Sequence, residues 1–322
     1  MVEASGAVAV VFPGQGAQYV GMGKELYDTC PDAKEIFEEA NRILRFHISR
    51  LMFDGPEETL TRTANSQPAI FAMSYAAWQA LHARAGWLEP RAFAGLSLGE
   101  YTALVAAGAI SFEEGLKIVR KRGEYMEEAC LARPGTMASV IGLTMEEVRS
   151  VCASAQRFGI VDVANANSPG QVVISGEKGA VEAAAEVARE RGAKRVIELK
   201  VSGAFHSRLM EDAEERLRKE LRKVSLTRAR VPVVANVTAE DETEPEEIRE
   251  NLARQVTGSV LWQKSVEFLV EHGVKTFVEV GCGNVLQGLI RRTCPETVRM
   301  GVEDSASLEA AVKALREHRN SP

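Results

Sequence analysis

The sequence has 322 residues, enough for one large domain or about two of ordinary size, and it can bury a core without disulfide bonds. A composition of 45% hydrophobic and 26% charged residues excludes a disordered or collagen-like chain. A net charge of −6 argues against a nucleic-acid-binding face. The longest uncharged stretch, Thr63 to Ala83, contains Asn65, Gln67 and Pro68, which argues against a membrane span.

The cysteines and the N-terminus point to a cellular compartment. Five cysteines, an odd number without a CxxC pair, favour a reducing cytoplasm and argue against a zinc site. The segment Met1–Ala4 lacks the basic start of a signal peptide. We therefore expect a cytoplasmic protein.

The first third of the chain alternates strands and helices. The apolar run Ala7–Phe12 predicts a buried strand that ends at Pro13-Gly14, and a helix is expected after Pro68. Ala92–Leu96 predicts a second strand, which a turn at Ser97 joins to a helix. This order predicts an α/β fold, with a hydrolase-like core and a parallel sheet.

The middle of the chain predicts a smaller unit in which strands and helices follow a different order. Thr144-Met145-Glu146-Glu147 has the spacing of a capping box and opens a helix. The residues on either side predict four strands and two helices in the order β-α-β-β-α-β, with a turn at 165–170. We therefore expect a ferredoxin-like subdomain over 133–202, inserted into a large domain formed by 1–132 and 203–322.

The last third returns to the α/β pattern. A helix is expected from His206 to Lys223, a strand over Val231–Val237 and a helix over Pro245–Val256. Strands and helices then alternate to the end of the chain. The acidic run Glu240–Glu247 predicts a solvated loop and helix start.

A nucleophile motif follows the second strand. Gly95-Leu96-Ser97-Leu98-Gly99 matches G-x-S-x-G, in which a sharp strand-to-helix turn exposes the serine oxygen. The amide of Leu98 then points at the oxyanion that forms during attack. A tight turn with an inert serine is the alternative.

The loop after the first strand is a second candidate. In Pro13-Gly14-Gln15-Gly16-Ala17-Gln18, Tyr19 occupies the third glycine position of a dinucleotide fingerprint, so a phosphate cradle is disfavoured. An oxyanion-binding amide at Gln15 is preferred, and a plain glycine turn is the alternative.

Among the five histidines, His206 is the best candidate for the base that a nucleophilic serine needs. It lies at a strand-to-helix junction, where α/β active sites form. The one aspartate between Ser97 and His206 is Asp162, inside the predicted subdomain. We therefore infer a Ser–His dyad in which a backbone carbonyl orients the histidine.

The helix expected around Leu116–Met126 carries two arginines that are candidates for binding a substrate carboxylate. Arg120 and Arg122 flank the apolar stripe of Leu116–Met126, from which a guanidinium can reach a cleft and bind a carboxylate bidentately. A solvated basic face is the alternative for either residue.

Together these motifs resemble the malonyl-coenzyme A:acyl carrier protein transacylases of fatty acid synthesis and the related acyltransferase domains of polyketide synthases. The resemblance runs from about Val8 to Ala314. It rests on the segments 12–18 and 95–101, Asn167–Val172, Ala204-Phe205-His206-Ser207 and Glu279-Val280-Gly281.

The resemblance implies a role for each site residue. Ser97 is the acyl-accepting nucleophile, His206 the base, and Arg122 the ligand of the malonyl carboxylate. The amides of Gln15 and Leu98 form the oxyanion hole, and the backbone carbonyl of Gln255 orients His206. Phe205 before the histidine is the malonyl-selecting form of its motif.

The implied activity is ping-pong transfer of malonyl from malonyl-CoA to the phosphopantetheine thiol of an acyl carrier protein, with no bound cofactor and no metal. We expect a monomer with an acidic carrier as its transient partner. The cluster Arg189, Arg191, Lys194 and Arg195 is a candidate docking patch, with a solvated helix end as the alternative. A thioester hydrolase and a non-catalytic carrier-binding module remain as competing functions.

Two positions depart from the family. Leu96 stands where relatives most often have His beside the nucleophile, so a role of that neighbour in positioning the serine is in doubt. Ser259 stands where many relatives have Pro, which we interpret as loop variation.

Overall fold

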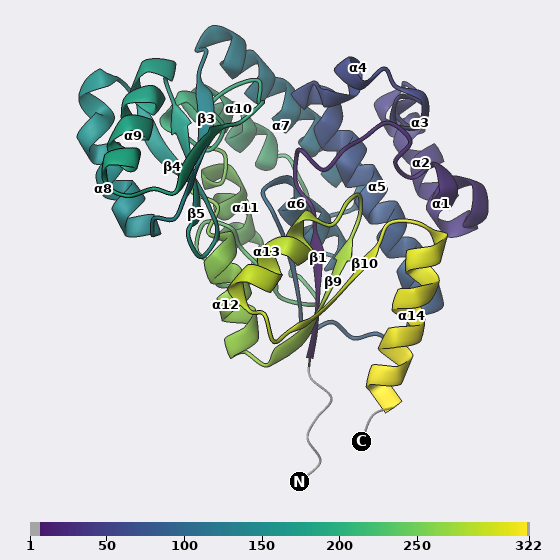
Figure 1. Cartoon of the computed structure of the whole chain (residues 1–322). Coiled ribbons are helices and arrows are strands. Elements are labelled where there is room, and N and C mark those ends of the chain that lie inside the picture. Colours follow the sequence, from purple (N-terminus) through teal and green to yellow (C-terminus); the bar gives the residue numbers. More distant parts are fainter. Residues whose placement is uncertain (1–6, 321–322) are drawn as a thin grey trace.

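The computed structural model describes residues 7–320, so the segment Met1–Ala4 lies outside the described residues. A six-stranded sheet forms its centre, in the order β10-β9-β1-β2-β7-β8, and every neighbouring pair is parallel except β7 with β8 (Figure 1). The strands are β1 (Ala7–Phe12), β2 (Ala92–Gly95), β7 (Val233–Val234), β8 (Asp241–Glu242), β9 (Val274–Val280) and β10 (Val298–Val302). The predicted α/β fold with a parallel sheet is confirmed.

Helices surround this sheet and connect its strands. They are α1 (Lys24–Thr29), α2 (Pro31–Leu44), α3 (Ile48–Asp54), α4 (Glu57–Thr61), α5 (Thr63–Arg84), α6 (Leu98–Ala106), α7 (Phe112–Ala132), α10 (Glu211–Leu221), α11 (Pro245–Arg254), α12 (Trp262–Glu271), α13 (Val285–Thr293) and α14 (Ser305–Asn320).

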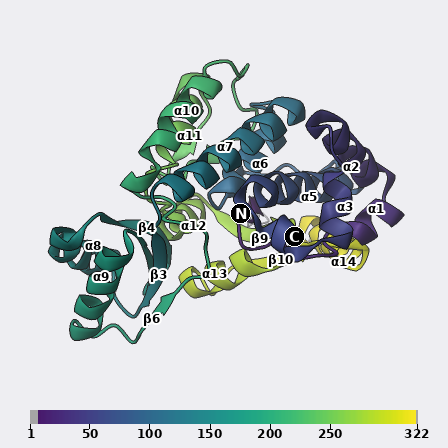
Figure 2. The same ribbon diagram turned by 90° about the horizontal axis from the view of Figure 1, so that it is seen from above.

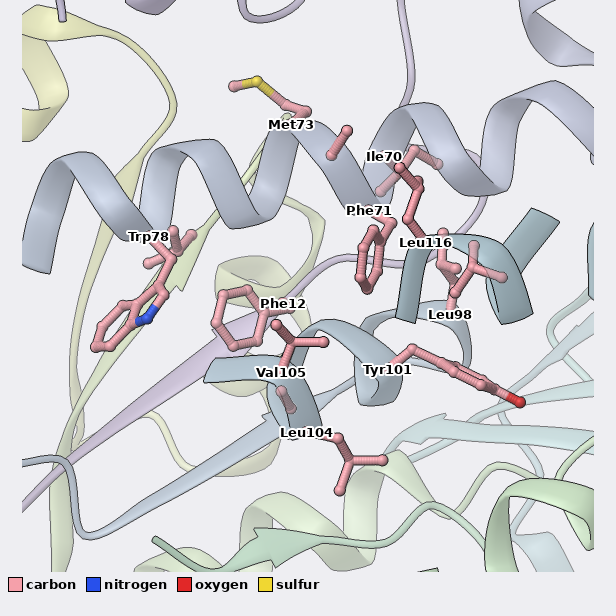
Figure 3. Close-up of a cluster of buried hydrophobic side chains, with 14 of the residues drawn as sticks. Phe12, Ile70, Phe71, Met73, Trp78, Leu98, Tyr101, Leu104, Val105 and Leu116 are labelled. Atoms are coloured by element: carbon pink, nitrogen blue, oxygen red, sulfur yellow. The ribbon is translucent and has the colours of Figure 1, made fainter. Parts of the chain in front are cut away.

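The alternation of β1 side chains separates two hydrophobic cores. Val8, Val10 and Phe12 join the core under α5, α6 and α14, whereas Ala9 and Val11 join the core under α12 and α13. In the first core, side chains of α5 such as Phe71 meet those of α6 (Figure 3). The sheet is therefore covered on both faces, as its apolar strands require.

Helix α5 begins earlier than predicted. It starts at Thr63 and contains Pro68, so the prediction of a helix only after this proline is wrong. Proline has no N–H, which leaves the carbonyl oxygen of Ala64, four residues earlier, without its helical donor. The Arg120 guanidinium of α7 donates to that oxygen at 2.7 Å, and this long-range contact stabilises the first turn.

A second, four-stranded sheet is formed by the middle of the chain. Its elements are β3 (Thr136–Ile141), α8 (Met145–Ala155), β4 (Val161–Ser168), β5 (Gln171–Gly176), α9 (Lys178–Glu190) and β6 (Arg195–Glu198). The strands pair antiparallel in the order β4-β5-β3-β6, and α8 and α9 pack together on the side away from the large sheet (Figure 2). The predicted capping box at Thr144 is confirmed. The division into 1–132 with 203–322 and 133–202 stays a prediction.

Strand β4 is longer than predicted. The expected turn at 165–170 is wrong, because the strand continues to Ser168 and turns at Pro169-Gly170. The backbone of Ala164 and Ala166 bonds to Val260, at 2.8 and 2.9 Å, and these contacts hold the segment extended. They also join the small sheet to the large body.

Two expectations between residues 206 and 247 need correction. The helix expected from His206 begins with a 3₁₀ turn at Arg208, and the strand expected over Val231–Val237 is reduced to the two residues of β7. The acidic run is not wholly solvated, because Glu242 is 1% exposed. Its carboxylate accepts a hydrogen bond from Asn251 at 2.8 Å.

Candidate active site

A strained turn presents Ser97 between β2 and α6. Its backbone has φ 52° and ψ −101°, outside the regions that non-glycine residues favour. The flanking glycines allow the backbone to pass this closely. A Cβ on Gly95 would lie 1.9 Å from the carbonyl carbon of Gly99, and a Cβ on Gly99 would lie 2.1 Å from the carbonyl oxygen of Phe12. The G-x-S-x-G spacing is therefore a steric requirement of this turn.

His206 lies directly beside this serine. Its Nε2 is 2.8 Å from Ser97 Oγ, and its Nδ1 is 2.7 Å from the carbonyl oxygen of Gln255. Burial, together with the positive charge of Arg122, lowers the pKa of His206 from 6.5 to about 4. The ring is therefore neutral at pH 7. Its Nδ1–H donates to Gln255, and its Nε2 is free to accept the serine proton.

Asp162, the one aspartate between Ser97 and His206 in the chain, pairs with another residue. Asp162 accepts hydrogen bonds from the backbone and side chain of Arg208, and none is given to it by His206. The Gln255 carbonyl oxygen lies beside His206 Nδ1, at the position where we expected a backbone oxygen.

Arg122 is buried within hydrogen-bond distance of Ser97 Oγ. It is 1% exposed and donates to Ser97 Oγ at 3.0 Å, to Gln67 Oε1 at 2.8 Å and to Gln255 Oε1 at 3.0 Å. Burial lowers its pKa, but a guanidinium stays charged at neutral pH. Among residues 7–320 no carboxylate lies within ion-pair distance of this cation, although the buried Glu100 carboxyl acts on it at longer range, and its Nε has no hydrogen-bond partner. An anionic substrate group can therefore supply the missing charge.

Arg120 differs in its surroundings. Its side chain pairs with Glu124 at 2.8 Å and is 27% exposed. Arg120 thus supports the fold, and Arg122 alone of these two arginines reaches the site.

The two backbone amides that we predict to bind an oxyanion are those of Leu98 and Gln15. The Leu98 amide begins α6 directly after Ser97, and the Gln15 amide lies in the loop that follows β1. Neither amide donates a hydrogen bond to the part of the chain that the structure describes. Gln15 is held through its side chain, which bonds to Thr63 Oγ1 and Gln67 Nε2, each at 3.3 Å.

One cavity of about 540 Å³ between the large body and the small sheet is lined by Gln15, Ser97, Arg122 and His206. It lies at the carboxyl ends of β1 and β2, where ligands bind in parallel sheets. The lining includes Gln15, Leu96, Ser97, Arg122, Phe205 and His206 from the large body and Met137, Asn165, Asn167, Gln171 and Val173 from the small sheet. The cations Arg62 and Lys200 also line it.

Three buried polar residues contact the site, and we assigned none of them a role from the sequence. Gln67 Oε1 accepts from Arg122, Asn236 Oδ1 accepts from the Ser97 amide, and Glu100 Oε2 accepts from the Asn236 amide and from the Gln255 side chain. Each is fully buried. A polar residue within an apolar helix, such as Gln67 after Ser66, was the one available signal.

The remaining histidines with described side chains have other surroundings. His82 stacks on Trp78, and His272 caps the end of α12 through the Phe268 carbonyl at 2.8 Å. His47 precedes α3. Within residues 7–320 no three His, Cys, Asp or Glu side chains converge as metal ligands, and no helix is long and apolar enough to cross a membrane.

The family known as the acyl transferase domain matches residues 9–321. Together with a serine, a neutral histidine and a buried arginine in one cavity, this match defines the protein as an acyltransferase.

Relatives narrow the assignment. The malonyl CoA-acyl carrier protein transacylase of Bacillus subtilis is 44% identical over 98% of this chain and 99% of its own length. An acyl carrier protein S-malonyltransferase structure from Vibrio cholerae shares 41% identity and a TM-score of 0.91, over 94% of this chain and 99% of its own. A type II PKS malonyl-transacylase was solved in complex with its acyl-carrier protein. It shares 40% identity and a TM-score of 0.92 with this chain, over 96% of this chain and 99% of its own. The chain belongs to the malonyl-CoA:acyl carrier protein transacylase family, as its resemblance predicts.

Proposed function

We propose that this enzyme transfers the malonyl group of malonyl-CoA to the phosphopantetheine thiol of an acyl carrier protein and so supplies extender units for fatty acid biosynthesis. The observation that carries the proposal is the buried, unpaired Arg122 cation 3.0 Å from the oxygen of Ser97. An acyl group held at Ser97 with a free carboxylate on its far end can pair with that cation. The names of the relatives support the same substrates.

In the first half-reaction the Ser97 hydroxyl attacks the thioester carbon while its proton passes to His206 Nε2. The carbonyl oxygen becomes an oxyanion that the amides of Gln15 and Leu98 bind, and such a donor is worth about 10²–10³ in rate. The C–S bond then breaks. The proton on His206 goes to the leaving coenzyme A sulfur, and a malonyl ester remains on Ser97.

In the second half-reaction the carrier thiol takes the place of coenzyme A. His206 removes its proton, and the sulfur attacks the Ser97 ester. The ester C–O bond breaks, and His206 returns the proton to Ser97 Oγ. The Gln255 carbonyl keeps the His206 ring in the tautomer that both steps need.

The residues in the cavity supply the nucleophile, the base and the charge, so we propose chemistry without a resident cofactor. Arg62 and Lys200 at the cavity are suited to the phosphates of coenzyme A or of phosphopantetheine. The exposed cluster 189–195 stays a candidate patch for an acidic carrier. We propose a cytoplasmic location, with which the five unpaired cysteines agree, and a monomer.

A comparison of two products tests the proposal against a thioester hydrolase. Malonyl-CoA is supplied with holo carrier, and malonyl-carrier and free malonate are measured together over time. We expect malonyl-carrier to dominate and Ser97→Ala to form neither product above background. Free malonate as the main product would instead identify a hydrolase.

A further inference from the structure

The side chain of Asn236 continues the sheet past the end of β7. Backbone pairing of β2 with β7 stops at Ala94 opposite Val234. Beyond it, Asn236 Nδ2 donates to the Gly95 carbonyl at 2.7 Å, and its Oδ1 accepts from the Ser97 amide at 2.6 Å. These two groups flank Leu96 in the chain. A backbone residue in a parallel ladder bonds to its neighbour in the same pattern, so the Asn236 amide replaces a missing strand residue.

Asn236 bonds to the strained turn at Ser97, which requires support from its surroundings. The φ of 52° at Ser97 belongs to a conformation that is strained for a non-glycine residue and persists only where its surroundings enforce it. On the β1 side, the Leu96 amide donates to the Phe12 carbonyl at 3.1 Å. On the β7 side the hydrogen bonds to Gly95 and Ser97 come from Asn236.

One carboxylate oxygen links this clamp to the base. Glu100 Oε2 accepts from the Asn236 backbone amide at 2.8 Å and from Gln255 Nε2 at 3.0 Å. Gln255 Nε2 also donates to the Ser97 carbonyl at 2.9 Å, and the Gln255 carbonyl accepts from His206. The nucleophile turn and the histidine are thus fixed to a common point.

We propose that Asn236 and Glu100 are positioning residues for acyl transfer. Asn236 fixes the turn of Ser97, and Glu100 fixes Asn236 and Gln255, so that Ser97 Oγ stays within reach of His206. Neither residue touches the reacting atoms. The inference rests on the proposed function, because it requires Ser97 to be the nucleophile.

The surroundings of Glu100 agree with this role. Its side chain is fully buried, and its Oε1 has no hydrogen-bond partner among residues 7–320. Burial raises its pKa to about 7, although the donors Asn236 and Gln255 and the charge of Arg122 act in the opposite direction. A carboxyl group in such a place is costly for folding alone.

Asn236→Ala tests the clamp, and Asn41→Ala is its matched control. Asn41 is also buried and also holds a serine with two hydrogen bonds, to the Ser49 amide at 3.1 Å and to Ser49 Oγ at 2.8 Å, but it lies in α2 and does not line the cavity. Both variants lose comparable contacts. The unfolding midpoint and the single-turnover rate of Ser97 acylation by malonyl-CoA are measured for each folded protein.

We expect a lower unfolding midpoint in both variants. The maximal acylation rate should fall about 10- to 100-fold in Asn236→Ala alone, and the malonyl-CoA concentration that gives half of that rate should change less than about threefold. Equal acylation rates in the two variants would overturn the inference. A wild-type enzyme that forms no malonyl-Ser97 would refute the proposed function itself, so the two failures are distinguishable.

Glu100 supplies a second, independent test. Glu100→Gln keeps an oxygen that can accept from Asn236 and Gln255, whereas Glu100→Ala removes it. We expect the glutamine variant to retain acylation within about threefold and the alanine variant to lose at least about tenfold per folded protein. Equal rates in these two variants would overturn the role of Glu100, even if Asn236→Ala does not fold.

Discussion

Removal of the Arg122 charge should change which acyl group the enzyme prefers. Arg122→Met keeps an unbranched side chain but removes every N–H donor. In the wild-type enzyme a malonyl carboxylate can take two charge-assisted hydrogen bonds from the guanidinium, and such bonds are worth about 1.5–3 kcal/mol each. The free guanidinium already donates to Gln67, Ser97 and Gln255, so part of this gain is an exchange of partners.

We therefore expect a loss of about 2–4 kcal/mol in malonyl transfer, which is about 30- to 10³-fold in kcat/KM. Acetyl transfer should fall much less, because an acetyl group makes no pair with the cation and leaves it buried without a counter-charge. The ratio of the two rates is the quantity to measure, since any general damage to the Ser97 hydroxyl cancels in it.

Arg120→Met is the matched control on the same helix. Arg120 is two residues from Arg122, donates to Glu124 and to the Ala64 carbonyl, and does not line the cavity. Its loss should lower the unfolding midpoint and leave the malonyl-to-acetyl ratio unchanged. If malonyl and acetyl transfer fell equally in Arg122→Met, the assignment of Arg122 to the carboxylate would be wrong.

Three further predictions concern His206, Ser97 and Gly99. Because only neutral His206 accepts a proton and its pKa is lowered to about 4, the acylation rate should stay constant as pH falls through 6.5 and decline near 4. In Arg122→Met the loss of the positive charge should raise the pKa of His206, so the decline should occur at a higher pH. Rate-versus-pH profiles of both enzymes test the direction of this shift. Ser97→Gly should be about 1–2 kcal/mol more stable to urea than Ser97→Ala, since glycine relieves the left-handed φ; equal stability would show that the turn is not strained. Gly99→Ala should fail to give folded protein, because its Cβ would overlap the Phe12 carbonyl oxygen, and a normal circular dichroism melt would contradict this.

The sequence predicted those parts of the site that depend on local chain geometry. Ser97 could be found because its flanking glycines are required by the steric contacts of the turn. His206 could be chosen because it follows a strand and because no suitable acid lay before it. The first argument uses neighbours in the chain, and the second uses the residue types and their order along it, so neither needs a contact in space.

The buried polar network could not be predicted in this way. Asn236 contacts Ser97 across 139 positions, and it lies where the pattern predicted an unbroken strand to Val237. Its side chain takes the place of strand backbone, and nothing in a local pattern distinguishes the two. Glu242 sits in an acidic run typical of solvated loops, yet burial raises its pKa well above 4.5 and Glu100 adds to that rise.

Leu96 illustrates a departure that the structure explains in part. Its backbone is held on both sides, by Phe12 and by the Gly99 amide, without help from its side chain. The side chain packs against the core under α12 and α13 and lines the cavity. The geometry of the Ser97 turn therefore does not require an imidazole at this position.

If Ser97 carries the malonyl group between two thiols, a malonyl-Ser97 intermediate can be isolated. The enzyme is mixed with malonyl-CoA, freed of coenzyme A by rapid gel filtration and analysed by intact and peptide mass spectrometry, before and after holo carrier is added. We expect one malonyl group per enzyme, located on Ser97, that disappears from the enzyme as an equal amount appears on the carrier. Transfer to the carrier without any malonyl-enzyme, or a malonyl group on a residue other than Ser97, would contradict it.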